Sequence, residues 1–348
     1  MDKLIFLHYL LPFFGAFFIG LILTILVKHY AEAKKILDWP SSPRKIHSHP
    51  IPLLGGLAIY LTIVILMMVF KDYLLDGRIT QGYLWSIIIG GLFLMVGGYL
   101  DDRFDLKPWQ LLIAPILASL TVILAGVQIK YITNPGGGII NISSVIISSV
   151  IVFIWLMGMI YTTKLLDGLD GLVSGITFIG SVILFAVSLF WDIQMSGTSI
   201  LCLLLAGSVL GFLIFNFHPA KIFLGEGGST FLGFMLGVLA IISGAKIATT
   251  LLIMGIPILD VFWVIIRRLF KEKHSLATSD KKHLHFRLLD IGFNQRQAVL
   301  FLYFLTLLFG GVAVFQKTIG KLIALVVLLF VMIILAFWLL QRYKKINS

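Results

Sequence analysis

Residues 322–340 read LIALVVLLFVMIILAFWLL, a stretch without one charged side chain. A helix of about 20 apolar residues crosses the hydrocarbon core of a bilayer, so this stretch predicts a membrane span. Outward from it, comparable runs lie at residues 4–27, 53–70, 83–100, 109–127, 144–166, 172–191, 198–216, 229–245, 248–266 and 297–315. The sequence therefore predicts an all-α polytopic transmembrane bundle of about eleven spans, built from one integral-membrane domain over residues 1–348. Only a short tract around Lys246 separates the runs at 229–245 and 248–266, which could merge into one span.

The composition excludes other broad classes of protein. Hydrophobic residues make up 59% of the chain and charged residues 12%, which is too apolar for a soluble domain or a disordered chain. We expect the first run to be a retained span, because no small-residue cleavage site follows it. The single cysteine, Cys202, rules out an intrachain disulfide. The net charge of +11 raises the question of sidedness, and we expect no nucleic-acid partner.

The basic residues divide unequally between two sets of loops. Of the 27 Lys and Arg residues, one set of loops holds seven, namely Lys3, Lys71, Arg78, Lys130, Lys246, Lys317 and Lys321. The other 20 lie at the opposite ends of the spans, in loops near residues 28–52, 101–108, 164–171, 216–228 and 267–296 and in the tail. The positive-inside rule predicts that these loops and the C-terminus are cytoplasmic and that the N-terminus is outside. Twelve of the 16 acidic residues fall on the same side, which that rule does not explain.

Two of these cytoplasmic segments carry paired carboxylates. The first is Asp101-Asp102-Arg103-Phe104-Asp105, directly after a span. Adjacent carboxylates at a membrane edge repel each other, so a metal, a cation or water must offset their charge. The second is Asp167-Gly168-Leu169-Asp170-Gly171, where glycines allow tight turns close to a ligand. The alternatives are a solvated loop with a capping Asp for the first and a plain inter-span turn for the second.

Two further segments suit phosphate. The first, at residues 216–229, reads NFHPAKIFLGEGGS, and the glycines around Glu226 form a turn that leads into a span, with Ser229 as its expected N-cap and Glu226 as a carboxylate for a divalent cation. No Gly-Lys-Ser/Thr follows, so this is not a Walker A loop. The other segment, at residues 280–287, reads DKKHLHFR, and its clustered Lys, His and Arg side chains suit phosphate oxygens. A bare turn, a zinc site and simple positive-inside charge are the alternatives.

Together these segments place acidic and basic groups on one membrane face. Metal ions bridging phosphate oxygens are the common strategy of phosphoryl transfer, so the sequence predicts a soluble phosphate substrate and a lipid substrate. Outside, Asn134-Pro135-Gly136-Gly137-Gly138 predicts a turn and a short hairpin.

The ordered motifs resemble those of the polyprenyl-phosphate N-acetylhexosamine-1-phosphate transferases along nearly the whole chain. Besides the four segments, Arg44-Lys45-Ile46-His47 and Pro50-Ile51-Pro52-Leu53-Leu54-Gly55-Gly56 are similar to the family's first cytoplasmic loop. Pro257-Ile258-Leu259-Asp260, followed by Arg267-Arg268, resembles the run into its largest loop. The His-Leu-His-Phe-Arg pattern looks more like the undecaprenyl-phosphate N-acetylglucosaminyl branch, which initiates O-antigen and teichoic acid, than like the phospho-MurNAc-pentapeptide branch, which shows consecutive histidines.

The resemblance implies transfer of a HexNAc-1-phosphate from a UDP-sugar to undecaprenyl phosphate, with release of UMP and with Mg²⁺ (or Mn²⁺) as cofactor. It implies a multi-pass enzyme of the plasma membrane whose active site faces the cytoplasm, and it leaves a homodimer open. By match to the family, Glu226 is the metal-binding residue. The catalytic positions are Asp101, Asp102, Asp167, Asp170, His283 and His285, and the substrate-binding positions are Lys45, His47, Asn216, Phe223 and Arg287.

The chain departs from the family pattern at three positions. Glu226 stands where the family usually has Asp, Lys164 replaces the usual Asn, and Phe286 interrupts the usual His-x-His-His. These departures bear on the choice of sugar and nucleotide rather than on the reaction class. Direct attack by the lipid phosphate and a two-step route through an aspartyl-phosphate both remain open. The alternative functions are phospho-MurNAc-pentapeptide transfer, a non-catalytic scaffold, and transport of lipid-linked sugars, although no repeat typical of transporters is visible.

Overall fold

Each of the eleven apolar runs forms helix in the computed structural model, which describes residues 6–40, 49–75, 79–134, 138–191, 196–243, 246–268 and 283–346. The helices are α2 (Leu11–Ala33), α3 (Gly55–Val69), α4 (Lys71–Leu74), α5 (Gln81–Phe104), α6 (Ile113–Leu124), α7 (Val145–Leu166), α8 (Leu172–Trp191), α9 (Gly197–Asn216), α10 (Gly225–Ile242), α11 (Ile247–Ile253), α12 (Gly255–Arg267), α13 (Leu284–Asp290), α14 (Gln295–Phe315) and α15 (Thr318–Ile346), with the short turns η1 (Phe6–Leu10) and η2 (Gln110–Leu112). The prediction of an all-α bundle is confirmed.

Fewer of these helices than expected meet the length of a full span. Within the described ranges, eight are long and apolar enough to cross a membrane, and the bent pair α11–α12 brings the number to nine if it counts as one span. The other two runs form shorter apolar helices, Gly55–Val69 and Gln110–Leu124. The expected eleven spans are therefore eight or nine by length and composition. The 75° bend between α11 and α12 lies where Pro257 lacks the N–H that a continuous helix would donate to Ile253.

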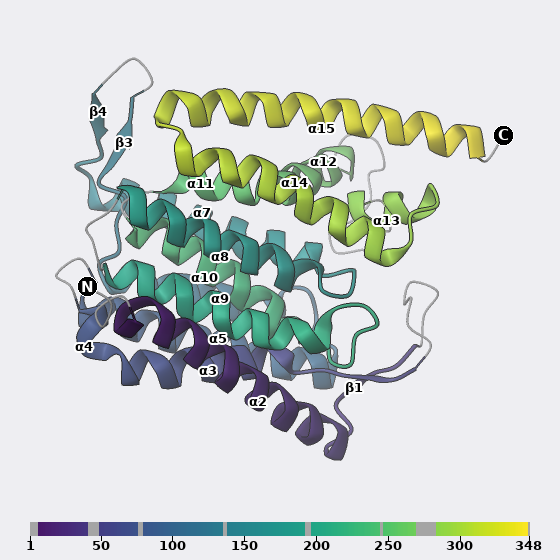
Figure 1. Cartoon of the computed structure of the whole chain (residues 1–348), viewed down its shortest axis with the longest axis horizontal. Coiled ribbons are helices and arrows are strands. Elements are labelled where there is room, and N and C mark those ends of the chain that lie inside the picture. Colours follow the sequence, from purple (N-terminus) through teal and green to yellow (C-terminus); the bar gives the residue numbers. More distant parts are fainter. Residues whose placement is uncertain are drawn as a thin grey trace.

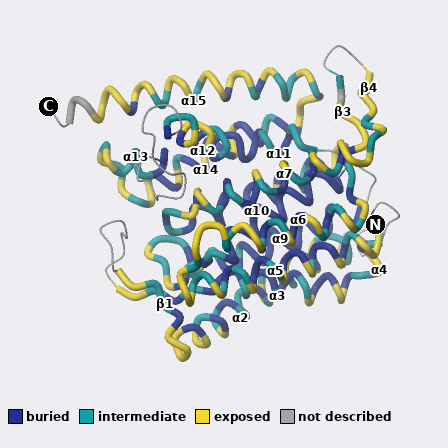
Figure 2. The backbone as a smooth tube through the Cα atoms, turned by 180° about the vertical axis from the view of Figure 1, so that it is seen from behind, coloured by how far each residue is buried: buried dark blue, intermediate teal, exposed yellow. Residues whose placement is uncertain are grey.

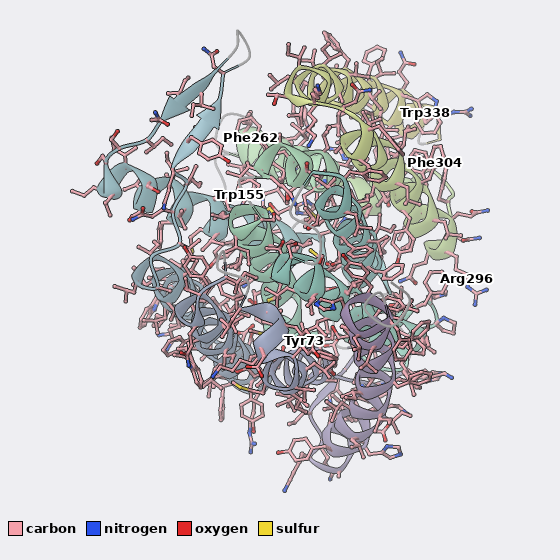
Figure 3. The ribbon with its side chains drawn as sticks, turned by 60° about the vertical axis from the view of Figure 1, so that its left-hand side comes forward. Tyr73, Trp155, Phe262, Arg296, Phe304 and Trp338 are labelled. Atoms are coloured by element: carbon pink, nitrogen blue, oxygen red, sulfur yellow. The ribbon has the colours of Figure 1, made fainter. Side chains whose placement is uncertain are left out.

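The helices lie roughly side by side, with α15 along one edge of the bundle and α2 and α3 along the other (Figure 1). The centre is α10, because 94% of its most apolar window is buried, against 17% for α15. Figure 2 shows the buried backbone concentrated in this middle layer of α9 and α10. On the outside, exposed aromatic residues of α12, α14 and α15, among them Phe262, Phe304 and Trp338 (Figure 3), suit contact with lipid.

Two small antiparallel pairs connect the helices. Strands β3 (Tyr131–Thr133) and β4 (Ile139–Asn141) pair antiparallel, which confirms the predicted hairpin, whose residues 135–137 lie outside the described residues. Strands β1 (Leu37–Asp38) and β2 (Ile51–Pro52) pair at the opposite end of the bundle, the end at which α13 lies (Figure 1). Beside β2, the Phe223 N–H donates to the Pro52 carbonyl at 2.8 Å, and the Gly55 N–H donates to the Phe223 carbonyl at 2.9 Å. The chain before α10 is therefore fastened to the chain before α3.

Glycines bring α3, α5 and α10 into close contact at this end. A Cβ on Gly56 would overlap with the backbone of Gly228, and a Cβ on Gly98 would overlap with the backbone of Gly227. Small residues at helix interfaces let backbones approach in this way. The junction determines where the first turn of α10 lies. That turn begins at Gly225, so the prediction of Ser229 as N-cap is wrong, and the Ser229 hydroxyl donates back to the Gly225 and Glu226 carbonyls.

Candidate active site

A cleft of about 1180 Å³ opens at the end of the bundle that carries β1 and β2. Its walls come from the C-terminal ends of α5, α7 and α9, the first turn of α10 and the loops between them. Seven of the predicted site residues line it, namely Asp101, Asp102, Asp167, Asp170, Asn216, Phe223 and Glu226. Residues from three separate motifs thus meet in one polar cleft at the end of an apolar bundle.

Glu226 lies in the first turn of α10 and forms an ion pair with Lys164. The Lys164 Nζ atom is 2.5 Å from the Glu226 Oε1 atom, and the two side chains are 20% and 17% exposed. Lys164 lies in the last turn of α7, with its Nζ atom 5.7 Å from the centre of the Tyr161 ring. The predicted metal-binding carboxylate is therefore neutralised by an ammonium group in this structure.

The neighbouring carboxylates of α5 have different partners. Asp102 Oδ1 accepts a hydrogen bond from the Glu226 N–H at 3.1 Å, so it binds the free N-terminus of α10. Asp101 Oδ1 accepts from the Leu106 N–H at 2.9 Å and closes the end of its own helix. Gly225 has a φ of +73°, and a Cβ there would overlap with Asp102 Oδ2. Glycine is therefore required between these two carboxylates.

Asp167 and Asp170 flank the turn between α7 and α8. Helix α7 ends at Leu166, and Gly171, with a φ of +78°, lets the chain reverse into α8. The Tyr303 hydroxyl of α14 donates to the Gly171 carbonyl and anchors this turn. Asp167 lines the cleft. Its pKa is raised above the ordinary value, chiefly because the surrounding protein desolvates the carboxyl group and then because of the charges of Glu226 and Asp102.

Asp170 and Asn216 hold the loop between α9 and α10. Asp170 Oδ2 accepts from the Ala220 N–H at 3.1 Å and lies 2.7 Å from His218 Nδ1. The amide of Asn216 donates to the Ile222 carbonyl at 3.0 Å and accepts from the Ser174 hydroxyl at 2.6 Å. Both residues thus fix the loop that presents Phe223 to the cleft.

His283 and His285 lie behind the cleft wall, on the short helix α13 or at its start. His283 Nδ1 is 2.8 Å from Asp260 Oδ2, and the Leu284 N–H donates to the other oxygen of Asp260 at 2.8 Å. His285 is buried against Gly168, at 1% exposure, and neither ring nitrogen has a hydrogen-bond partner among the described residues. Burial lowers the pKa of His285 to about 4, which keeps the ring neutral. Arg287 is half-buried on the same helix.

The predicted substrate-binding residues Lys45 and His47 lie outside the described residues. One cleft residue received no role from the sequence, although it stands inside a quoted motif. His218 pairs with Asp170, and its carbonyl accepts from the Arg296 side chain of α14, labelled in Figure 3, at 3.1 Å. The signal was its place two residues after Asn216 in the same loop.

The carboxylate oxygens of the cleft are the kind of ligand that a hard divalent cation prefers. Within the described part of the chain, no three His, Cys, Asp or Glu side chains cluster closely enough to enclose a metal by themselves. Mg²⁺ is usually held by one or two carboxylates together with substrate phosphates, so an incomplete protein cage is what such a site requires. Asp102, Asp167 and Glu226 lie close enough for their charges to interact. A phosphate-bearing ligand would complete the set.

Comparison with known proteins agrees with this geometry. Residues 84–244 match the family model described as glycosyl transferase family 4. A Bacillus subtilis protein named probable undecaprenyl-phosphate N-acetylglucosaminyl 1-phosphate transferase is 31% identical over 86% of this chain and 82% of its own length. A Thermotoga maritima protein named undecaprenyl-phosphate alpha-N-acetylglucosaminyl 1-phosphate transferase is 30% identical over 93% of this chain and 96% of its own. A Streptococcus thermophilus phospho-N-acetylmuramoyl-pentapeptide-transferase is 29% identical over 59% of this chain.

Proposed function

The chain belongs to glycosyl transferase family 4, in the branch of the polyprenyl-phosphate N-acetylglucosaminyl-1-phosphate transferases, and on that premise we propose its reaction. The protein transfers N-acetylglucosamine 1-phosphate from UDP-N-acetylglucosamine to undecaprenyl phosphate and releases UMP. The lipid diphosphate-sugar then begins a glycan of the cell envelope. The observation that carries this proposal is the carboxylate-lined cleft at the end of an apolar helical bundle, where a soluble and a lipid substrate can meet.

The proposed chemistry is direct attack of the acceptor phosphate on the donor's β-phosphorus. A new P–O bond forms to the lipid phosphate oxygen, the bond to the bridging oxygen breaks, and UMP leaves with that electron pair. A phosphate monoester has a second pKa of about 6, so the acceptor is largely dianionic at neutral pH and needs positioning more than a strong base. Asp102, at the edge of the cleft, is positioned to orient the acceptor or to take up a residual proton.

The remaining cleft residues hold the donor in this proposal. Phe223, which lines the cleft between two backbone hydrogen bonds, offers an aromatic face to the uracil base. Asp170 and Asn216 keep the loop of Phe223 in place through the contacts with Ala220 and Ile222. Mg²⁺ is proposed to bind at Glu226, where it would screen the charge of the diphosphate and of the leaving UMP.

The placement in the cell is also a proposal. The chain is a multi-pass membrane protein, and its cleft lies at the end of the bundle with the excess of Lys and Arg, so we place the active site at the cytoplasmic face of the plasma membrane. A homodimer remains a prediction. Transporters place ionisable residues within their spans, and Asp260 of α12 is the candidate for such a residue. Both of its carboxylate oxygens instead bind the start of α13, so the transport alternative finds no support there.

A donor panel tests the proposed function. Purified full-length protein receives undecaprenyl phosphate, Mg²⁺ and, in separate reactions, UDP-N-acetylglucosamine, UDP-N-acetylgalactosamine or UDP-MurNAc-pentapeptide, and UMP release is measured. The proposal expects release with UDP-N-acetylglucosamine that depends on the lipid acceptor. Turnover with UDP-MurNAc-pentapeptide alone would assign the chain to the other branch, and no turnover with any donor would favour a scaffold.

A further inference from the structure

Lys164 and Glu226 form a direct ion pair inside the cleft, and the two helices that carry them cannot easily separate. Helices α7 and α10 pack closely at Gly233, where a Cβ would overlap with the Thr163 hydroxyl and the Met159 carbonyl of α7. Lys164 therefore stands beside the first turn of α10 whether or not a ligand is bound. We therefore expect a ligand that needs the Glu226 carboxylate to displace the Lys164 side chain, because separating the two helices would break their backbone contact at Gly233.

The ammonium group and a metal ion compete for the same carboxylate. At 2.5 Å, the Lys164 Nζ atom occupies the direction from which a cation would approach Glu226 Oε1. Both side chains are largely withdrawn from water, at 20% and 17% exposure, so the pair is screened less than a surface pair. If a metal ion binds Glu226 without an accompanying anion, the Lys164 ammonium group is left in the cleft without a counter-ion, which opposes binding.

A diphosphate changes this balance. Lys164 lines the cleft on a flexible four-carbon stem, so its ammonium group can turn from Glu226 toward a phosphate oxygen without movement of α7. The donor thus supplies an anion for the lysine at the same moment as it supplies oxygen ligands for the metal. Lys164 and Glu226 are also two of the three positions at which the chain departs from the family pattern, and here they contact each other.

We propose that Lys164 is an internal counter-ion that occupies Glu226 in the ligand-free protein, so that a divalent cation binds Glu226 tightly only together with a diphosphate donor. The inference rests on the proposed function for the identity of the donor and on Glu226 as the metal-binding carboxylate. Lys164 acts through Glu226 and is in that sense a positioning residue.

A titration of the full-length protein with Mn²⁺ tests this inference. Binding is measured as the loss of the free Mn²⁺ signal in electron paramagnetic resonance. Without donor, Lys164→Gln is expected to bind Mn²⁺ roughly tenfold more tightly than the wild type, a difference of about 1.4 kcal/mol. Lys164→Arg keeps the positive charge and is expected to bind as weakly as the wild type. Lys221→Gln is the matched control, because Lys221 lines the same cleft and is expected to leave the affinity unchanged.

Addition of UDP-N-acetylglucosamine without acceptor provides the second half of the test. The donor is expected to tighten Mn²⁺ binding to the wild type far more than to Lys164→Gln, so that the difference between them disappears. Equal Mn²⁺ affinities without donor would overturn the inference, and so would tighter binding in Lys164→Arg. The UMP-release assay distinguishes the two proposals, because a wild type that binds Mn²⁺ as expected but turns over no donor contradicts only the proposed function.

Discussion

At the scale of single residues, the carboxylates of the cleft have separate partners. Asp102 accepts the N–H at the start of α10, Asp170 binds the loop after α9, and Glu226 is paired with Lys164. Asp167 lines the cleft, and desolvation by the surrounding protein, followed by the charges of Glu226 and Asp102, raises its pKa. Repulsion between acidic groups in one cleft is thus reduced by three different contacts, two of which also hold the backbone.

Loss of the Glu226 charge is expected to abolish most of the transfer. Glu226→Gln keeps the size of the side chain but removes the anion that Lys164 and the proposed metal need, so we expect the UMP-release rate to fall about 100-fold or more. Glu226→Gln also leaves the Lys164 ammonium group uncompensated in a pair that is largely withdrawn from water, so we expect a lower thermal midpoint, and the rate is compared well below that midpoint. A variant that retains wild-type turnover would contradict the assignment of Glu226 as the metal-binding carboxylate.

The buried His285 predicts a loss of stability in acid. Its pKa is about 4 in the folded protein against 6.5 for an ordinary histidine, so the unfolded chain binds more protons between these values. The free energy of unfolding is therefore unaffected by this group above about pH 6.5, and it declines as the pH falls toward 4.

His285→Leu should remove part of this decline and leave the thermal midpoint at pH 7.5 unchanged or higher, because the ring nitrogens have no hydrogen-bond partner within the described ranges. Melting curves in detergent from pH 7.5 to 4.5 measure both effects. A pH dependence identical to that of the wild type would show that His285 is not the titrating group. Loss of transfer in a well-folded His285→Leu would instead support the catalytic role predicted from the sequence.

At the scale of elements, the site depends on the junction of α3, α5 and α10. The helix starts and ends that carry Leu54, Asp102 and Glu226 meet there through glycine contacts and backbone hydrogen bonds. None of these contacts involves a large side chain, so the geometry of the first turn of α10 follows from how closely three backbones approach. Small changes in this packing are therefore transmitted directly to Glu226.

Gly98→Ala is expected to disturb both stability and activity. The new methyl group would overlap with the backbone of Gly227, and overpacking of this kind costs about 1–3 kcal/mol. Gly158→Ala is the matched control, because Gly158 lies within helix α7 with no atom within 4 Å of the added Cβ, and alanine favours helix. The thermal midpoint and the rate of UMP release are measured for both variants, and both quantities should fall in Gly98→Ala but not in Gly158→Ala. Equal midpoints and equal rates in the two variants would contradict the proposed importance of the junction.

At the scale of the whole molecule, hydropathy predicted where the helices lie but overestimated how many of them have the length of a full span within the described residues. The runs at 53–70 and 109–127 were apolar enough, yet their helices stop at 15 and 12 residues, with η2 preceding the latter. The break at Met254 depends on Pro257, a signal that the apolar count at 248–266 does not register. Local composition thus fixes the helical segments, whereas chain reversals depend on single residues.

The candidate site was predictable to a similar degree. Carboxylates beside glycines identified the cleft residues, because such motifs are local in sequence. The pairs Lys164–Glu226 and Asp170–His218 join residues 62 and 48 positions apart, so only the fold could reveal them. The burial of His283 and His285 was also hidden, since the same residue types suit both a phosphate site and an anchored helix.

The orientation of the whole molecule has its own test. The only cysteine, Cys202, is buried at 1% exposure, so the wild type should give little reaction with a membrane-impermeant maleimide. Lys107 and Lys130 are exposed at opposite ends of the bundle. Lys130→Cys should react in intact cells and Lys107→Cys only after permeabilisation, and the reverse pattern would contradict a cytoplasmic active site.

The fate of the donor's β-phosphate tests the central claim most directly. UDP-N-acetylglucosamine labelled with ³²P at the β-phosphate is incubated with undecaprenyl phosphate, Mg²⁺ and the purified full-length protein, and lipid and aqueous products are separated. Transfer of the sugar together with its phosphate predicts that the label enters the lipid in equal amount to the UMP released. Label that remains in the aqueous phase as UDP, or that never leaves the donor, would contradict the account.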